Sequence, residues 1–445
     1  MVKRLAALLL FFNCAIACAQ TIKTDVLVIG GSPSGVAAAI QCARSKVKTV
    51  LIDEGTTLCS SMTANNMTTI KTDRDLPSGV WAEFRKRVVE HYKKTPGYDT
   101  SYNAPLQLQP DSGAMILANI ADSVKDLDIK LQTTFIDIVK DDDRWQVSIT
   151  QNGIPETIKA RVIIDATNTG EIAAKAGSKA IDFDKRPNKG GLNLYRTSIA
   201  MGDFSPMFYE DIVAPEYNYP PYPTFFMPIK ALVANGVDNI LLSEKWLPLQ
   251  KTIQDLSSQI TIGQGAGVTA AYCAFYKTTT ANLNVRAIQG ELLSFKGYLL
   301  PLEDISADPY CRAIQQVCAT GMLRGIQKGS GRNTQFLFMP DSTVTTAEVK
   351  PYLLEIYTRA FLWFNTEKPG EKFTVGNLLS FISELTLTDP ENVKKNIGNA
   401  WNTQYKFTSA FDLNRPITRR EFAILANKYL NPFGRAVDLN GRMVN

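Results

Sequence analysis

The sequence predicts an α/β fold with a parallel sheet, followed by a mostly α-helical region. Residues 25–54 have the pattern of a strand, a glycine turn, a helix and a second strand, in that order. From about residue 296, short helical patterns replace the apolar runs that are typical of buried parallel strands. A chain of 445 residues is long enough for two or three domains with a sizeable core.

The first strand and the turn after it form the strongest motif. Val26–Ile29 is a continuous apolar run, as expected for a parallel strand covered on both faces. Gly30, Gly31 and Gly35 then bracket a tight turn before a helix. The free N–H groups and the dipole at a helix start suit a pyrophosphate, so this turn is a candidate dinucleotide site.

The second strand, Thr49–Ile52, ends at an acidic residue. Asp53 has the position at which a carboxylate accepts the hydroxyl groups of an adenosine ribose. The pattern departs from G-x-G-x-x-G at Ser32, whose side chain can either crowd a phosphate or form a hydrogen bond with it. The order of strand, turn, helix, strand and acid predicts a nucleotide-binding fold.

Composition excludes two kinds of site. The net charge is +5 and no long Lys/Arg run occurs, so nucleic acid is not an expected partner. The only histidine, His91, falls in a helical pattern that includes Val80, Phe84 and Val88. A solvated helical histidine is a better interpretation than a catalytic one, and no second histidine is available for a metal site.

The first 19 residues predict a secretory signal peptide. Lys3 and Arg4 precede the apolar run Leu5–Phe12, and Ala17-Cys18-Ala19 fits cleavage before Gln20. Cys18 also resembles a lipoprotein processing site, which leaves lipid anchoring as an alternative. We expect an exported protein, periplasmic or extracellular, with no transmembrane segment after cleavage.

Cleavage after Ala19 leaves five of the seven cysteines in the mature chain. An odd number without paired local spacing does not predict a disulfide framework, even in an oxidising compartment. Buried thiols are the favoured interpretation. The five are Cys42, Cys59, Cys273, Cys311 and Cys318.

Two later segments are predicted to return the chain to the parallel sheet. Ile158–Ile164 predicts a strand whose following turn, 165–171, lies beside the glycine turn at the carboxyl edge. Val237–Leu242 predicts another strand, and residues 262–267 are expected to open a small-residue helix. Between them, residues 178–236 are rich in aromatic residues and proline, which indicates either a substrate cap or an excursion packed on the sheet.

These motifs together resemble the FAD-dependent oxidoreductases with a glutathione-reductase-type nucleotide domain, over residues 24–280. The resemblance implies FAD as cofactor, with the helix that begins near Gly263 pointing its N-terminus at the flavin. It implies cofactor contacts from Gly30, Gly31, Ser32, Pro33, Ser34, Gly35, Asp53, Glu54, Ser61, Met62, Ile136, Ala166, Thr167, Asn168, Glu171, Gly263, Gly265, Ala266 and Gly267.

The chain departs from this family at several glycine positions. Members usually have glycine where this chain has Ser32, Cys59, Ser60, Asn168 and Glu244. Each change adds a side chain near a loop expected to approach the cofactor, and Glu244 adds charge. The departures leave open whether the site binds flavin with shifted geometry or is retained only as a scaffold.

Residues 298–435 resemble S-layer-homology repeats. The match includes Met339-Pro340-Asp341 and the segments Thr345–Glu348 and Thr418–Glu421, each with a Thr and a Glu three residues apart. The resemblance implies a cell-envelope glycan as a partner. The predicted organisation is a signal peptide at 1–19, an FAD-binding oxidoreductase domain at 20–295 with a cap at 178–236, and a helical repeat domain at 296–445.

The resemblance implies a secreted FAD-dependent oxidoreductase that transfers a hydride between a small organic substrate and the flavin. The alternative is an envelope-associated binding protein with an inert nucleotide domain. Tyr195, Arg196 and Lys245 are candidate polar groups near the substrate, and no catalytic base is assigned. Cys59 lacks a partner at the spacing of a redox disulfide, so a non-redox thiol is favoured.

Overall fold

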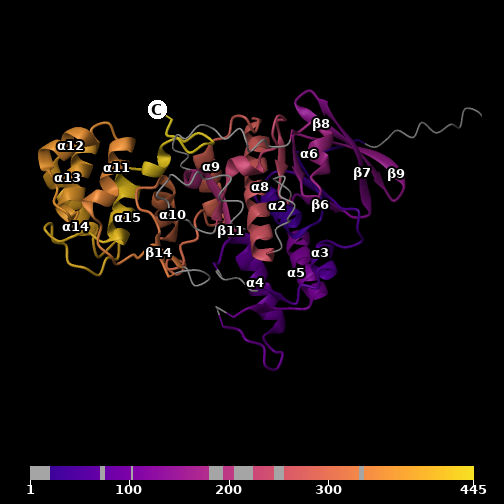
Figure 1. The fold of residues 1–445 in the computed structure, drawn as a ribbon, viewed down its shortest axis with the longest axis horizontal. Coiled ribbons are helices and arrows are strands. Elements are labelled where there is room, and N and C mark those ends of the chain that lie inside the picture. Colours follow the sequence, from indigo (N-terminus) through magenta and orange to yellow (C-terminus); the bar gives the residue numbers. More distant parts are fainter. Residues whose placement is uncertain are drawn as a thin grey trace, which may run out of the picture.

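The computed structural model describes residues 21–70, 76–101, 104–179, 194–204, 224–244, 255–329 and 335–444. The predicted signal peptide lies outside the described residues. The predicted fold class is confirmed: an α/β part with a parallel sheet comes first and a helical part follows. In Figure 1 the C-terminal helices, orange to yellow, lie beside the α/β part and contact it through α10 (Cys311–Thr320).

The parallel sheet has five strands in the order β13-β10-β2-β3-β6. The predicted strands Val26–Ile29 (β2) and Thr49–Ile52 (β3) are confirmed to the residue, and both are buried along their whole length. The other three are β6 (Leu127–Lys130), β10 (Val162–Asp165) and β13 (Ile240–Leu242). Because all five are parallel, their carboxyl ends meet at one edge.

A second sheet corrects the prediction for residues 158–164. Its order is β1-β9-β8-β7, formed by β1 (Thr21–Lys23), β9 (Ile154–Ala160), β8 (Arg144–Gln151) and β7 (Thr133–Asp141). The apolar run is therefore two strands, β9 and β10, in different sheets. The chain passes between them at Arg161, whose amide donates to Asp25 O and whose side chain pairs with Asp143. Because buried residues flank Arg161 on both sides, hydrophobic periodicity does not reveal this boundary.

Helix α8 (Leu256–Tyr276) corrects a second prediction. It begins at the N-cap Asp255, whose side chain accepts from Ser258 N, and not near Ile262. The glycines that we expected at the helix start lie in its interior. A Cβ added at Gly263 would lie 2.0 Å from Ser34 O, and one at Gly267 would lie 2.5 Å from Ala38 O. The small residues therefore allow close packing against α2 (Pro33–Arg44).

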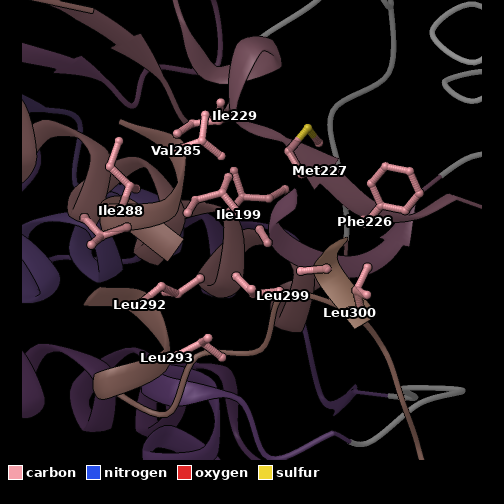
Figure 2. Packing of buried hydrophobic residues seen from close by; sticks show 14 of the residues in the cluster. Ile199, Phe226, Met227, Ile229, Val285, Ile288, Leu292, Leu293, Leu299 and Leu300 are labelled. Atoms are coloured by element: carbon pink, nitrogen blue, oxygen red, sulfur yellow. The ribbon is translucent and has the colours of Figure 1, made fainter. Parts of the chain in front are cut away.

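The described part of the predicted cap packs into the core. It consists of η1 (Leu194–Thr197), β11 (Ser198–Phe204), β12 (Thr224–Pro228) and η2 (Ile229–Leu232). Figure 2 shows Ile199, Met227 and Ile229 packed with residues of α9 (Val285–Ser294). This supports the packed excursion for the described residues. The aromatic residues between 205 and 223 lie outside them.

Three loops of the helical part form a ring of backbone hydrogen bonds. Val344 N donates to Ile417 O, Ile417 N to Phe373 O, and Phe373 N to Val344 O. Each loop leads into a helix capped by a threonine: Thr345 for α11 (Thr346–Ile356), Thr374 for α13 (Val375–Thr386) and Thr418 for α15 (Arg419–Tyr429). The threonine caps predicted at 345 and 418 are confirmed, and Thr374 caps the helix between them, with Asn377 in place of the glutamate.

The remaining elements connect these layers. They are α3 (Ser60–Ala64), β4 (Thr69–Ile70), α4 (Gly79–Tyr92), β5 (Leu106–Gln107), α5 (Pro110–Asp122), α6 (Glu171–Lys175), β14 (Ile326–Lys328), β15 (Gln335–Leu337), α12 (Ala360–Glu367), α14 (Pro390–Ala400) and η4 (Pro432–Gly434). His91 lies on α4, as predicted. In the described part of the chain, no helix combines the length and apolarity of a membrane span, and no cluster of metal-ligating side chains occurs.

Candidate dinucleotide site

Three strand ends meet at the carboxyl edge of the parallel sheet. In the sheet register Asp165 lies between Ile29 of β2 and Leu242 of β13. Ala166 N donates to Ile29 O at 2.9 Å, and Ser243 N donates to Asp165 O at 3.1 Å. The turn after β10 therefore lies beside the glycine turn, as the sequence predicted.

The first and third glycines of the turn are required by close packing. Gly30 has φ +111°, and a Cβ there would lie 2.5 Å from Ala166 O. A Cβ at Gly35 would lie 2.1 Å from Gly30 O. These are the roles of a tight turn and of close helix–strand packing that a dinucleotide fingerprint assigns to these glycines.

Ser32, at the position of the missing middle glycine, is the N-cap of α2. Its hydroxyl accepts from Gly35 N at 3.1 Å, so the side chain satisfies one free N–H of the helix start. Ser34 Oγ donates to Ser243 Oγ at 2.9 Å, which ties the same helix start to the end of β13.

Asp53 lies against the glycine turn. Its Oδ2 accepts from Gly31 N at 2.5 Å and its Oδ1 accepts from Gly55 N at 2.8 Å. Each carboxylate oxygen can accept a further hydrogen bond, so ribose hydroxyls remain acceptable donors. A Cβ at Gly31 would lie 2.8 Å from Asp53 Oδ2, which explains glycine there. The neighbouring Glu54 is exposed.

Asp165 organises the second turn, a role that the sequence analysis did not assign. It is fully buried; Oδ1 accepts from Thr167 N and Thr167 Oγ1, and Oδ2 accepts from Ala173 N at the start of α6. Burial raises the pKa of this carboxyl, and these hydrogen bonds oppose the rise. The left-handed residue of this turn is Gly170, at φ +68°, and not Asn168, which is exposed.

Cys59 closes the site on the side of α3. It is fully buried, adopts φ +59°, and donates its backbone N–H to Gly31 O at 2.7 Å. Burial, with the nearby Asp53 and Glu244 carboxylates, raises the pKa of the thiol. A thiol held neutral in this way is a poor redox nucleophile, which supports the non-redox interpretation.

The other predicted contacts fall into two groups. Ser61 and Met62 lie on α3, and Ser61 Oγ is buried with no hydrogen-bond partner among the described residues. Ile136 is 48% exposed on β7 and its carbonyl accepts from Lys175 Nζ. By contrast, Gly263, Gly265, Ala266 and Gly267 lie inside α8, where the three glycines back directly onto Ser34, Ile199 and Ala38. They support the helix start rather than point a helix N-terminus at it.

The candidate substrate groups lie elsewhere. Arg196 is fully buried: its Nη atoms donate to Glu355 of α11 at 2.8 and 2.7 Å, and its Nε donates to Thr320 O at 2.9 Å. Tyr195 is buried beside it, with its ring centroid 5.6 Å from the Arg324 guanidinium. Both residues are therefore engaged in contacts between the two parts of the chain. Lys245 lies outside the described residues.

Residues 25–181 match the family model of FAD dependent oxidoreductases. The match indicates FAD as the cofactor. No curated protein matches the chain. Several solved structures are similar to it at low identity, with TM-scores below 0.5.

One such structure is p-nitrophenol 4-monooxygenase PnpA from Pseudomonas putida DLL-E4, at 14% identity and TM-score 0.25, covering 36% of this chain and 45% of that chain. Another is THI4 from Thermovibrio ammonificans, at 14% identity and TM-score 0.35, covering 62% and 97%. A third is the bacillithiol disulfide reductase of Staphylococcus aureus, at 17% identity and TM-score 0.24, covering 33% and 38%. The chain thus spans less than half the length of PnpA.

The site fits FAD with one exception. The glycine turn, Asp53 at the ribose position and the unpartnered hydroxyl of Ser61 are all suited to the adenosine and pyrophosphate parts. The exception is Glu244, two residues after the end of β13, which is only 8% exposed. Burial raises the pKa of its carboxyl, and the nearby Ser32 and Ser34 partly offset this.

Asp53→Ala is expected to weaken FAD binding by roughly 1–3 kcal/mol, because the ribose loses a charged acceptor and Gly31 and Gly55 lose their anchor. The measurement is quenching of flavin fluorescence in a titration with protein. Asp128→Ala, which removes an exposed carboxylate from β6, is the control and should leave the affinity unchanged. Equal affinities in all three proteins would refute the assignment of Asp53 to the ribose.

Proposed function

We propose that this protein is an exported FAD-dependent oxidoreductase that transfers a hydride between a small organic substrate and flavin. The observation that carries the proposal is the carboxyl edge at which the glycine turn, Asp53 and the start of α2 converge, within the residues that match the family. Bound flavin would supply the redox chemistry. The chain would supply binding and orientation, with Asp53 on the ribose and α2 at the pyrophosphate.

Export and envelope attachment are parts of this proposal that depend on the sequence. Residues 1–19 would direct export, to the periplasm or the exterior, with a lipid anchor at Cys18 as the alternative. Residues 20–295 would form the flavin domain and residues 296–445 a domain of S-layer-homology-like repeats. The ring formed by Val344, Phe373 and Ile417 supports three equivalent repeat units.

A glycan partner for these repeats has weaker support. Arg419, in the segment predicted to bind it, is 1% exposed, and its guanidinium donates to Phe338 O, Glu348 and Arg324 O. The adjacent Arg420 is more exposed but is paired with Asp308 at 2.9 Å. Neither arginine is displayed as a free cation, so a glycan would have to displace the Arg420 pair.

The second candidate function is an envelope-associated binding protein whose nucleotide domain is inert. It is favoured by the buried carboxyl of Glu244 at the helix start that would receive the pyrophosphate. Anaerobic mixing of FAD-loaded protein with alcohols, amines and 2-hydroxy acids distinguishes the two. An oxidoreductase should lose its oxidised-flavin absorption with at least one donor class. If dithionite removes the oxidised-flavin absorption and none of the donors does, the result would support the inert alternative.

A further inference from the structure

The end of β13 places a carboxyl at the start of α2 without a partner that balances its charge. Glu244 is 8% exposed, and its Oε1 has no hydrogen-bond partner among the described residues. The hydroxyls of Ser32 and Ser34 and the backbone of Ser34 are close enough to act on its carboxyl by hydrogen bonding. Buried carboxylates are ordinarily paired or fully hydrogen-bonded, so this position needs an explanation.

Two further contacts fix Glu244 at this helix start. Ser243, the preceding residue, is tied to Asp165 through its backbone and to Ser34 through its hydroxyl at 2.9 Å. The backbone of Ser34 in turn lies against Gly263, where a Cβ would be 2.0 Å from Ser34 O. The residue before Glu244 is therefore tied to the start of α2, and that helix start is packed against α8.

The charged and titratable groups around Glu244 do not neutralise its carboxyl. Asp53, from the end of β3, and Glu244 both act on the Cys59 thiol, so the three groups share one side of the site. Asp165, on the adjacent β10, is a second buried carboxyl. Among the described residues, no lysine or arginine pairs with Glu244. The Glu244 site thus contains carboxyls, a neutral thiol and the positive end of the α2 dipole.

That positive end can stabilise one anion more easily than two. The helix dipole is equivalent to roughly half a unit of positive charge, and Ser32 already uses the N–H of Gly35. A pyrophosphate at the same helix start would face an ionised Glu244 at close range in a water-poor site. Like charges in such a setting oppose each other's ionisation.

We propose that Glu244 is uncharged when FAD is bound, so that FAD binding to protein whose Glu244 is ionised takes up one proton at this residue. This inference rests on the proposed binding of FAD. It makes Glu244 a determinant of cofactor affinity, and it makes loading of the protein dependent on the pH of the compartment.

The direction of the pH dependence follows because FAD binds to the form of the protein in which Glu244 is protonated. FAD should bind tightly while Glu244 is protonated and lose affinity as the pH rises through the pKa of Glu244 in the free protein. Burial raises that pKa above the ordinary range of a glutamic acid, which moves the loss of affinity toward neutral pH. For one proton the dissociation constant rises by up to about tenfold per pH unit.

The test is a set of FAD titrations by isothermal calorimetry between pH 5 and pH 9, each in two buffers with different ionisation enthalpies. Wild type is compared with Glu244→Gln, with Glu244→Gly in case glutamine is too bulky, and with Glu367→Gln as an exposed-carboxylate control on α12. ADP-ribose is the second probe, because it has the same pyrophosphate diester and no flavin. Thermal melts check that each variant folds.

We expect wild type and Glu367→Gln to take up close to one proton at the high-pH end of this range and to bind both probes more weakly there. Either Glu244 variant should abolish the uptake and bind at least tenfold more tightly at pH 9. Binding without proton uptake at the high-pH end of this range, or uptake that persists in folded Glu244 variants, would overturn the role of Glu244 and leave FAD binding intact. Failure of every protein to bind FAD at any pH would overturn the proposed function as well.

Discussion

Gly263→Ala is expected to lower the free energy of unfolding by about 3 kcal/mol. The added methyl group would lie 2.0 Å from Ser34 O, a backbone atom that cannot rotate away. Either α8 or α2 must shift, and the shift falls at the helix start that would receive the pyrophosphate. The variant should therefore also bind FAD more weakly than wild type. Urea denaturation followed by circular dichroism measures the stability.

Gly290→Ala is the matched control for that substitution. Gly290 is also helical, on α9, and an added Cβ there would meet nothing within 4 Å. Alanine should stabilise the protein there by roughly 0.5–1 kcal/mol through helix propensity. If both variants changed stability by the same amount and sign, tight packing of α8 on α2 would not be what Gly263 provides.

Arg196→Leu is expected to destabilise the protein by roughly 3 kcal/mol, which is near the lower end of the range for removing one partner of a buried ion pair. The guanidinium is fully buried and binds Glu355 of α11, Thr320 O and Gly441 O. Glu355 keeps 39% of its side chain exposed, so water can solvate the carboxylate that is left behind. The loss would loosen the helical part from the α/β part, which thermal unfolding should report as a broader transition at lower temperature.

Arg359→Leu provides the comparison for an exposed pair. Arg359 is 44% exposed and binds Glu384 on the surface of the helical part. Such pairs contribute less than about 1 kcal/mol. Similar losses in the two arginine variants would show that the Arg196 cluster does not hold the two parts together.

The local sequence pattern predicted the first two strands of the parallel sheet closely. Val26–Ile29 and Thr49–Ile52 match the structure because each is a short apolar run bounded by turn residues. The boundary at Arg161 was missed because Ile158 and Ala160 before it and the strand after it are buried. The start of α8 was missed because its glycines were interpreted as a helix opening, although small residues also occur where two helices pack closely.

The part of the site that the motif itself specifies could be predicted from the sequence. Gly30, Gly35 and Asp53 lie where the motif places them. The left-handed residue of the second turn is Gly170, two residues after Asn168, and the motif does not fix this turn geometry. The closeness of Glu244 to Ser34 depends on a contact across more than 200 residues of chain, which no local pattern contains.

The most direct measurement is the FAD content of the mature protein. Purified chain is dialysed with excess FAD near pH 6, washed and denatured, and the supernatant flavin is quantified against protein. We predict close to one free FAD per chain, together with a rise in melting temperature, because a tenfold excess over the dissociation constant stabilises by about 1.4 kcal/mol. Protein that stays colourless and shows no thermal shift, in wild type and in Glu244→Gly alike, would contradict the assignment of FAD to this site.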